Sequence, residues 1–400
     1  CYCRIYAPSL SPCNPLTLLF MSQNSLHYFD CGTTSWPKSP ELQEVLAHYY
    51  EHPIGSYGRS TDPATLHATA AIEKLRDRLA VLLGGVDPTH IVFNSGATES
   101  INTILSSLQL EGRTLWISPL EHNAVMRPLT RLKTRYGFNL RIMPSAPDGR
   151  IDIERLRREA RPGTALAIVN AESNVNGVIQ PLEEIAQVIG GELGIPLLID
   201  TAQFLGFSQI PQGIEFDYIV FSGHKGLLGP TGTGGFYIRN PRSIEPLIVG
   251  GNGIHSENYT DTPLEMPERF SAGTPNMLGL AGLAAAVEHP VAWNTSRQDW
   301  KNLFEQIERN PDVRLLRSLD LAHQGPLFSL VHQTKRADEI ANALRYDHEI
   351  IVRDGLHCAP LAHQTLGTLA QGGSVRIGFS PFHTNEDLEL LVRALDDVLR

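Results

Sequence analysis

The sequence has no long uninterrupted apolar stretch. None of its apolar runs approaches the roughly 20 residues that a helix needs to span a bilayer. It also lacks an excess of basic residues, since 33 Lys and Arg stand against 43 Asp and Glu and the formal net charge is −10. An acidic surface repels phosphate backbones and anionic lipids, so we expect neither a nucleic acid nor a membrane as a partner.

Cysteine is scarce as well. There are only 5, and those at positions 1, 3 and 13 precede the first methionine, Met21. No further ligand cluster follows the first pair, so we expect no metal site. Cys31 and Cys358 do not make a disulfide framework, and a reducing cytoplasm is the expected location. We interpret residues 1–20 as an extension upstream of the protein proper.

The 400 residues are 42% hydrophobic, which is typical of a globular protein with more than one core. Short apolar runs without polar alternation favour strands buried on both faces. Helical stretches separate several of them, so we predict an α/β fold with a mainly parallel sheet covered by helices on both faces. The predicted strands are 90–93, 114–118, 165–170, 196–200, 218–222 and 235–238, and the predicted helices are 63–83, 98–108 and 182–190.

The pattern changes after about residue 290, where a smaller α+β domain is predicted. Its expected helices are 300–308, 336–344 and 386–399, and its expected strands are 327–332, 349–352 and 374–379. The predicted division is therefore a large domain at 38–290 and a small domain that combines 21–37 with 291–400.

Lys225 stands in a glycine-rich loop directly after a predicted strand. The segment 221–226 reads Phe-Ser-Gly-His-Lys-Gly, and four glycines follow at 229–235. Burying a lysine cation is costly, so a lysine placed there usually has a partner or a task. Its amine can form a Schiff base with an aldehyde cofactor, and the glycines let the backbone approach a bulky ligand. The alternative is a surface lysine that happens to follow a strand.

Residues at two other predicted strand ends could bind further parts of such a cofactor. Asp200 closes the run 196–199, and ligands of such sheets bind at the carboxyl ends of strands. A carboxylate there can pair with a protonated pyridine nitrogen, although a helix N-cap is the common alternative. The segment 94–99 leads through small residues into a helix, whose free N–H groups can bind phosphate.

Together these segments resemble the class V aminotransferase-like enzymes of the pyridoxal-phosphate (PLP) fold type I group, and within it the cysteine desulfurase and selenocysteine lyase branch. The similarity extends over nearly all of residues 26–395. Tyr-Phe-Asp-Cys-Gly-Thr-Thr-Ser at 28–35 is similar to the opening strand and turn of that branch, and Ser-Gly-His-Lys at 222–225 to its cofactor motif. Arg-Phe-Ser-Ala-Gly-Thr-Pro-Asn at 269–276 is similar to the segment that reaches the partner subunit's cofactor. The resemblance implies a homodimer with PLP bound to Lys225.

The resemblance also implies individual roles. The residues expected around the cofactor are Ala97, Thr98, Ser222 and His224 at the phosphate, Thr274 at the phosphate of the other subunit, His122 stacked on the ring, Asp200 at the ring nitrogen and Gln203 at the phenolic oxygen. Asn174 and Arg376 would hold the substrate, with the guanidinium gripping its carboxylate in a bidentate fork. Lys225 would move the Cα proton, and His122 would assist proton transfer.

Cys358 carries the predicted activity. It lies in His-Cys-Ala-Pro at 357–360, 18 residues before Arg376, in a segment that resembles the sulfur-accepting loop of the desulfurases. The thiolate is the reactive form, and His357 or the cofactor's charge could favour it. The alternative is a small buried core thiol. Cys31 and Asp62 replace an Asn and a His that are usual in the family, which bears on the substrate.

We therefore predict a homodimeric PLP-dependent cysteine desulfurase. It would convert L-cysteine to L-alanine and keep the sulfur as a persulfide on Cys358, from which an acceptor protein could take it. Selenocysteine lyase activity is the same chemistry on a weaker bond, and the sequence does not separate the two. A different class V aminotransferase, PLP lyase or epimerase would not need Cys358. The set of Lys225, Asp200, His122 and Arg376 argues against a non-catalytic scaffold.

Overall fold

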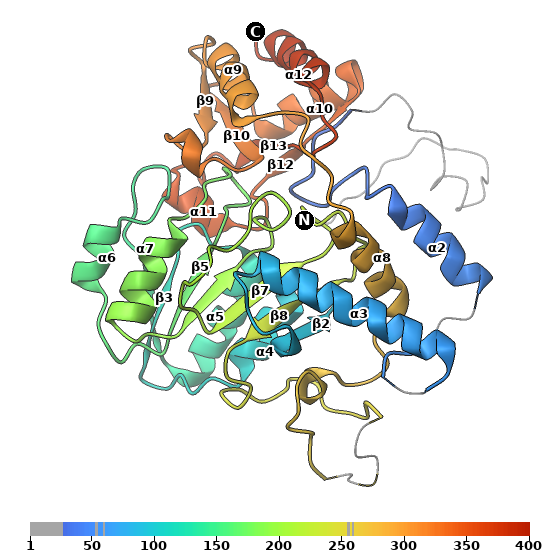
Figure 1. The fold of residues 1–400 in the computed structure, drawn as a ribbon. Helices are drawn as coiled ribbons and strands as arrows, with labels where there is room; N and C mark the ends of the chain where they lie inside the picture. Colours follow the sequence, from blue (N-terminus) through green and yellow to red (C-terminus); the bar gives the residue numbers. More distant parts are fainter. Residues whose placement is uncertain (1–26, 53–54, 59–60, 254–256, 258–259) are drawn as a thin grey trace, which may run out of the picture.

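The computed structural model describes residues 27–400 apart from 53–54, 59–60, 254–256 and 258–259 (Figure 1). The predicted extension at 1–20 and part of the segment around Asp62 lie outside the described residues. Figure 1 shows a large central sheet with helices around it and, above it, a C-terminal part that contains α9, α10 and α12. Within the described part of the chain, no helix is both long and apolar enough to cross a membrane.

The central sheet has seven strands in the order β2-β8-β7-β6-β5-β3-β4. The strands are β2 (Ile91–Asn94), β3 (Thr114–Ile117), β4 (Asn139–Ile142), β5 (Leu166–Asn170), β6 (Leu197–Asp200), β7 (Tyr218–Ser222) and β8 (Gly234–Ile238). All neighbours pair in parallel except β8, which is antiparallel to both β2 and β7. A parallel return would need a crossover of a dozen or more residues, and the loop from β7 to β8 contains no helix.

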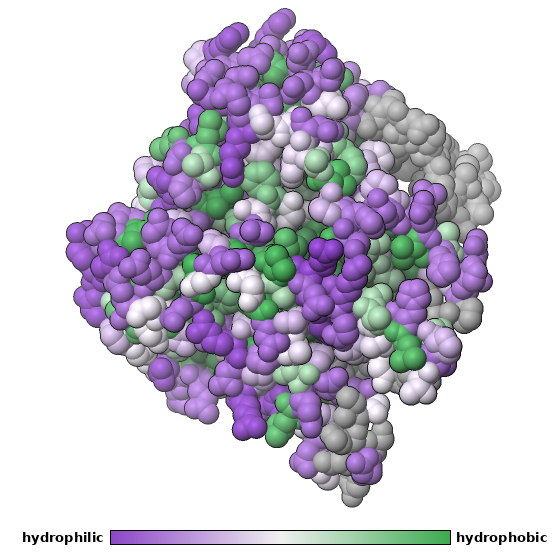
Figure 2. Space-filling model, in the orientation of Figure 1, coloured by the Kyte–Doolittle hydropathy of each residue, from purple (hydrophilic) through white to green (hydrophobic). Residues whose placement is uncertain are grey.

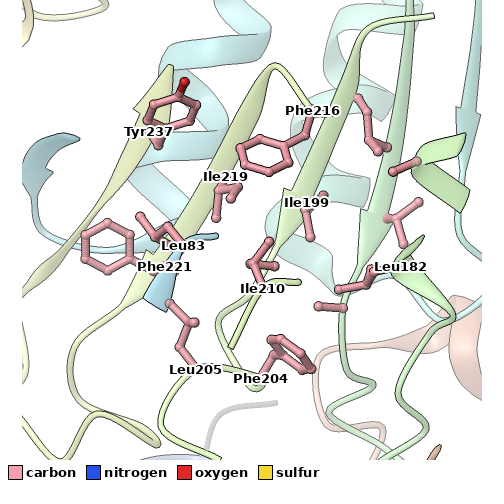
Figure 3. Packing of buried hydrophobic residues seen from close by; sticks show 14 of the residues in the cluster. Leu83, Leu182, Ile199, Phe204, Leu205, Ile210, Phe216, Ile219, Phe221 and Tyr237 are labelled. Carbon is pink, nitrogen blue, oxygen red and sulfur yellow. The ribbon is translucent and has the colours of Figure 1, made fainter. Parts of the chain in front are cut away.

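Alternate residues of the central strands enter two different cores. On β5, Ala167 and Val169 belong to one hydrophobic cluster, while Leu166 and Ile168 belong to the other. Because side chains alternate across a strand, this places a packed core on each face of the sheet. Figure 3 shows the first core, where Ile199 and Ile219 of the sheet pack with Leu83 and Leu182 from helical segments. The prediction of a mainly parallel sheet covered on both faces is therefore confirmed.

The helices around the central sheet agree with the amphipathic patterns of the sequence. Asp62 caps α3 through a 3.1 Å hydrogen bond from the Thr65 amide, and Pro63 occupies the first turn. The predicted helix at 182–190 instead changes to a π-helix at Gln187–Glu192. The helices are α2 (Glu41–Glu51), α3 (Pro63–Leu82), α4 (Ala97–Ser106), α5 (Asn123–Tyr136), α6 (Ile153–Glu159), α7 (Leu182–Ala186) and α8 (Met277–Glu288).

The C-terminal part has its own four-stranded antiparallel sheet in the order β12-β13-β10-β9. Its strands are β9 (Val313–Leu316), β10 (Leu327–His332), β12 (Arg353–Gly355) and β13 (Ser374–Gly378), and its helices are α9 (Arg297–Ile307), α10 (Ala337–His348), α11 (Pro360–Thr365) and α12 (Asn385–Val398). The N-terminal β1 (His27–Tyr28) pairs in parallel with β11 (Ile350–Ile351). Phe29 packs in the core of this part with Trp300 and Phe328. We propose this core as that of the predicted small domain.

The helices turn their polar faces outward. On the face shown in Figure 2, hydrophilic residues cover most of the surface and apolar residues form small groups between them. This is the expected consequence of amphipathic helices that bury one side against a sheet. The largest fully buried side chains, such as Trp300 and Phe221, lie in the clusters described above.

Candidate active site

The last residues of three adjacent parallel strands line one cavity of 280 Å³. They are Asn170 on β5, Asp200 on β6 and Ser222 on β7. This is the edge of a parallel sheet at which ligands are expected to bind. The structure brings nearly all of the predicted site residues to this cavity, namely Ala97, Thr98, His122, Asn174, Asp200, Gln203, Ser222, His224, Lys225, Cys358 and Arg376.

Lys225 lies in a tight turn after β7, and the residue is half-buried where it lines the cavity. The turn needs its glycines, because a Cβ on Gly223 would lie 2.3 Å from the Thr233 hydroxyl and one on Gly226 would lie 2.2 Å from the Leu205 carbonyl oxygen. Burial lowers the pKa of the Lys225 amine to about 8, although the Asp200 carboxylate opposes the shift. The amine is therefore closer to its neutral, nucleophilic form than an exposed lysine.

Asp200 is fully buried at the end of β6. Its Oδ1 accepts a 2.9 Å hydrogen bond from the Ala202 amide. Burial raises the pKa of the carboxyl, while the Ala202 amide and the charge of Lys225 oppose this shift. A buried carboxyl group at this edge can hold a cationic ring nitrogen, because such a partner favours its ionised form.

The start of α4 forms another wall of the cavity. Gly96, the N-cap residue, has a φ of 136° and no side-chain cap, which leaves the helix start open to a ligand. Ser222 faces this helix start, and its Oγ accepts a 3.4 Å hydrogen bond from the Ala97 amide. Nδ1 of His224 is buried and has no partner among the described residues. These groups can bind an anion.

His122 occupies the N-cap position of α5. Its Nδ1 accepts a 3.0 Å hydrogen bond from the Ala124 amide, so this nitrogen carries no proton. Burial, and then the charges of Lys225 and Arg376, lower the pKa of His122 to about 4. At neutral pH the ring is therefore uncharged, which suits stacking and proton transfer through Nε2.

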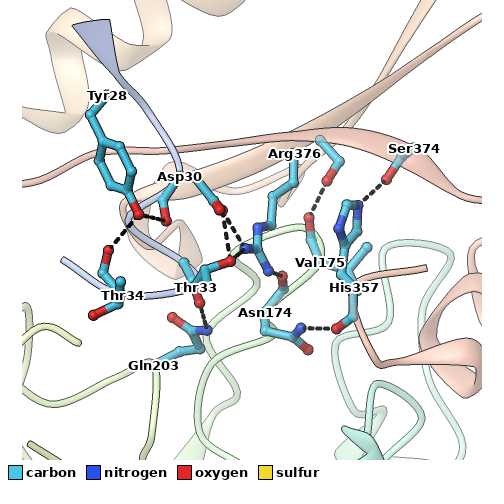
Figure 4. A network of polar contacts seen from close by, with 12 residues as sticks. Tyr28, Asp30, Thr33, Thr34, Asn174, Val175, Gln203, His357, Ser374 and Arg376 are labelled. Atoms are coloured by element: carbon cyan, nitrogen blue, oxygen red, sulfur yellow. Dashed lines mark hydrogen bonds and ion pairs between the residues drawn. The ribbon is translucent and has the colours of Figure 1, made fainter. Parts of the chain in front are cut away.

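Arg376 on β13 is buried and is held from several sides (Figure 4). Its Nη2 lies 2.7 Å from Asp30 Oδ1 and 2.8 Å from Thr33 Oγ1, and its Nη1 donates to the Asn174 carbonyl oxygen at 3.1 Å. A Cβ on Gly32 would lie 2.9 Å from the guanidinium carbon, so glycine leaves room for the arginine. Nε has no partner among the described residues, and the side chain lines the cavity.

Cys358 is exposed at the cavity, so the alternative of a buried core thiol is wrong. It and His357 have φ values of 55° and 48°, in the left-handed region that non-glycine residues rarely adopt. The Asn123 amide donates to the Cys358 carbonyl oxygen at 2.7 Å, and Asn174 Nδ2 donates to the His357 carbonyl oxygen at 2.7 Å. These bonds help hold the segment in its unusual conformation.

The structure corrects one expectation about this thiol. His357 is buried, its Nε2 lies 3.0 Å from the Ser374 hydroxyl, and burial lowers its pKa well below the ordinary value. Its ring is therefore neutral and cannot favour the thiolate by a positive charge. The cations that line the cavity beside Cys358 are Lys225, Arg353 and Arg376.

Thr274 lies elsewhere. It lines a second cavity of 490 Å³ together with Tyr57, Arg76 and Phe93. Its predicted place at the phosphate of another subunit stays a prediction. Gln203 lines the first cavity as expected, and its Nε2 donates to the Gly32 carbonyl oxygen at 2.8 Å.

Sequence reasoning missed some of the cavity residues. Glu172 and Arg353 both line it, yet neither was assigned a role. Arg353 could have been found, because it is the cation nearest to Cys358 in the sequence. No comparable signal marks Glu172, which reads as an ordinary acid near the end of a strand.

A class V aminotransferase family model matches residues 27–391, so the chain belongs to this family. Its fold is fold type I of the PLP-dependent enzymes. The solved cysteine desulfurase from Thermococcus onnurineus NA1 superimposes with a TM-score of 0.85 at 28% identity, over 94% of this chain and 95% of that one. A cysteine desulfurase from Escherichia coli gives a TM-score of 0.80 at 25% identity, over 97% and 99% of the two chains.

The curated relatives carry the same activity in their names. A cysteine desulfurase of Shigella flexneri is 30% identical over 394 residues, 94% of each chain. A probable cysteine desulfurase of Methanothermobacter thermautotrophicus is 27% identical over 381 residues, which cover 93% of this chain and 94% of the relative.

Proposed function

We propose that this chain is a PLP-dependent cysteine desulfurase that converts L-cysteine to L-alanine and holds the sulfur as a persulfide on Cys358. The observation that carries the proposal is the placement of an exposed thiol on the cavity that Lys225, Asp200 and Arg376 also line. A transaminase would need the lysine and the arginine but has no use for the thiol. The names of the relatives support the same activity.

The residues present fit PLP. The open start of α4, with Ser222 and His224 beside it, suits a phosphate, and the buried Asp200 suits a pyridinium nitrogen. Nδ1 of His224 and Oδ1 of Asn174 are buried polar atoms without a partner in the described part of the chain, and a bound ligand would satisfy them. In this proposal Ala97 and Thr98 complete the phosphate site, His122 stacks on the ring and Gln203 bonds its phenolic oxygen. When bound, PLP supplies an electron sink for a carbanion at the substrate Cα.

The side chains have separate roles in the proposed reaction. Nε of Arg376 has no partner in the part of the chain that the structure describes, so a substrate carboxylate can bind there, while Asp30 keeps the guanidinium in place. Lys225, whose amine has its pKa lowered by burial to about 8, takes the Cα proton in its neutral form. The neutral ring of His122 can pass a proton through Nε2. Cys358 attacks the substrate sulfur as a thiolate, so an S–S bond forms, the Cβ–S bond breaks and its electron pair stays with carbon, which is then protonated to give alanine.

The proposal also covers the assembly and the cellular location of the enzyme. We propose a homodimer in which Thr274 reaches the cofactor of the partner subunit, a cytoplasmic location and an acceptor protein that takes the sulfur from Cys358. The exposure of that thiol supports the last of these. The deciding experiment is an anaerobic assay of alanine and persulfide from L-cysteine by the PLP-loaded enzyme. Keto-acid-dependent transamination without persulfide would contradict the proposal.

A further inference from the structure

Glu172 is a fully buried acid that lines the same cavity as Lys225 but has no task in the chemistry above. It lies just beyond the end of β5, two residues after Asn170. Within the described residues, neither of its carboxyl oxygens has a hydrogen-bond partner. A buried carboxyl that lacks partners is costly, so an apolar side chain would be the more stable choice if only packing mattered.

The fold makes room for this acid. A Cβ on Gly325 would lie 2.4 Å from Cδ and Oε1 of Glu172 and 2.7 Å from Oε2. The carboxyl group therefore occupies the space that any larger residue at 325 would take. It is packed against the main chain that leads into β10 and not turned to solvent.

Two cations act on this carboxyl. Burial raises the pKa of Glu172 well above its ordinary value, and Arg297 and then Lys225 oppose the shift. Arg297 already has partners outside the cavity, because its Nε donates to the Gln324 carbonyl oxygen at 3.0 Å and its guanidinium lies over the Phe207 ring. Lys225 is the cation of the two that lines the cavity with Glu172.

Several charged groups in turn affect the protonation of the Lys225 amine. Asp200 and Glu172 favour its ammonium form, as does the thiolate form of Cys358, while Arg376 disfavours it. In the proposed enzyme Asp200 is engaged by the cofactor ring and Cys358 by sulfur transfer. Glu172 is then the acid left to balance the lysine when its amine is free.

We propose that Glu172 exchanges a proton with the Lys225 amine whenever that amine is free, and so helps to set the charge of the lysine. Glu172 is a positioning residue, because it acts through Lys225 and not on the substrate. The two groups are not hydrogen-bonded to each other, so the proton crosses the cavity that both line by way of water. The exchange breaks the carboxyl O–H bond and forms an N–H bond, and the net charge of the pair stays zero. A proton thus remains available in the cavity that both residues line. The inference rests on the proposed function, because it assumes that Lys225 is the lysine that reacts.

The test is the pH dependence of Lys225 in the wild-type enzyme and in Glu172→Gln. In the full-length chain stripped of PLP, acetylation of Lys225 by a limiting dose of acetic anhydride is measured by mass spectrometry between pH 4 and 10, a range that covers the wild-type midpoint near pH 8 and the lower midpoint expected in the variant. The pH midpoint should fall by about 1–3 units in Glu172→Gln, because a nearby carboxylate stabilises the ammonium. In the PLP-loaded enzyme, the pH midpoint of the cofactor's visible absorption should fall as well.

Glu121→Gln is the matched control. Glu121 is also fully buried, but Ser118 and the Asn170 amide bond its Oε1 at 2.7 and 3.0 Å, and it does not line the cavity. The midpoint of Lys225 should stay unchanged in this variant. An unchanged midpoint in Glu172→Gln would overturn the inference, because the acid would then stay neutral throughout. If the Gln variant does not fold, Glu172→Met is measured in the same way.

A failure of the inference about Glu172 can be distinguished from a failure of the proposed function. Borohydride reduction of the wild-type holoenzyme shows which lysine carries PLP, whereas the acetylation midpoint requires neither PLP nor cysteine. PLP found on another lysine would refute the role of Lys225 and leave the acetylation result intact. A normal PLP–Lys225 adduct with no midpoint shift would refute the exchange alone.

Discussion

Asn174 donates a hydrogen bond from Nδ2 to the main-chain oxygen of His357, 2.7 Å away. The main-chain oxygen of Asn174 itself accepts a bond from Arg376. Figure 4 shows these contacts from Arg376 through Asn174 to His357, the residue before Cys358. Asn174 thus joins the proposed carboxylate site to the left-handed backbone that presents the thiol.

We expect Asn174→Ala to slow sulfur transfer more than it weakens cofactor loading. The substitution leaves a buried carbonyl oxygen unpaired, which costs about 1–3 kcal/mol and loosens the Cys358 segment. If that cost falls entirely on the transfer step, kcat/KM for persulfide formation decreases by roughly 5–150-fold. Rapid-quench measurement of the persulfide checks this, with cofactor absorbance as the loading measure.

Asn176→Ala is the control for this prediction. Asn176 is equally buried, and its Nδ2 donates to the Asp148 carbonyl oxygen at 2.8 Å, away from the cavity. The variant should lose similar thermal stability but keep its rate of sulfur transfer. Equal rate losses in the two variants would show that Asn174 acts only through general stability.

Lys225→Ala should abolish covalent attachment of PLP and reduce alanine formation by about 10²–10⁴-fold, the usual contribution of a positioned proton-transfer group. The measurement is borohydride reduction followed by peptide mass spectrometry. Lys335→Ala serves as a comparison, because Lys335 bonds the Val398 and Arg400 carbonyl oxygens far along the chain. Cofactor trapped on any other lysine in the wild-type protein would refute the assignment.

Much of the site was predictable because its polar residues follow buried apolar runs. Asp200 and Lys225 were found in this way, and the parallel strands bring both to one cavity. The antiparallel direction of β8 was not predicted, because an apolar run has no direction. The pairing of Arg376 with Asp30 joins the two ends of the chain, so no local pattern could show it. The burial of Glu172 likewise depends on distant packing at Gly325.

Stability should fall as the pH is lowered from 6.5 to about 4, in part through His363. Burial lowers the pKa of this histidine from the usual 6.5 to about 4, and its Nδ1 lies 2.7 Å from the Thr368 hydroxyl. In this window the unfolded chain binds a proton that the folded chain does not, so acid favours unfolding. The melting temperature of His363→Gln should decline less steeply between pH 6.5 and 5. A slope identical to that of the wild type would mean that His363 is protonated in the folded state.

The role of the thiol is tested by comparing Cys358→Ser with Cys31→Ser. Both positions carry free cysteines, but Cys358 is exposed at the cavity, whereas Cys31 is buried and burial raises its pKa to about 11. Of these two thiols, that of Cys358 lines the cavity together with Arg376 and is placed to meet a substrate held there. We expect Cys358→Ser to load PLP and bind cysteine normally but to form no persulfide, because a hydroxyl cannot accept the sulfur.

Cys31→Ser should keep most of the activity, because Cys31 does not line the cavity and its Sγ contacts the Trp36 carbonyl oxygen. The measurement is a single turnover with L-cysteine, followed by mass spectrometry for a gain of one sulfur on the peptide that contains residue 358. Selenocysteine should be tested alongside, since selenium can leave without a nucleophile and its breakdown can survive in Cys358→Ser. Alanine formed from cysteine at the wild-type rate by Cys358→Ser would make the thiol a bystander. The remaining set of Lys225, Asp200 and Arg376 would then point to a class V aminotransferase or a general PLP lyase.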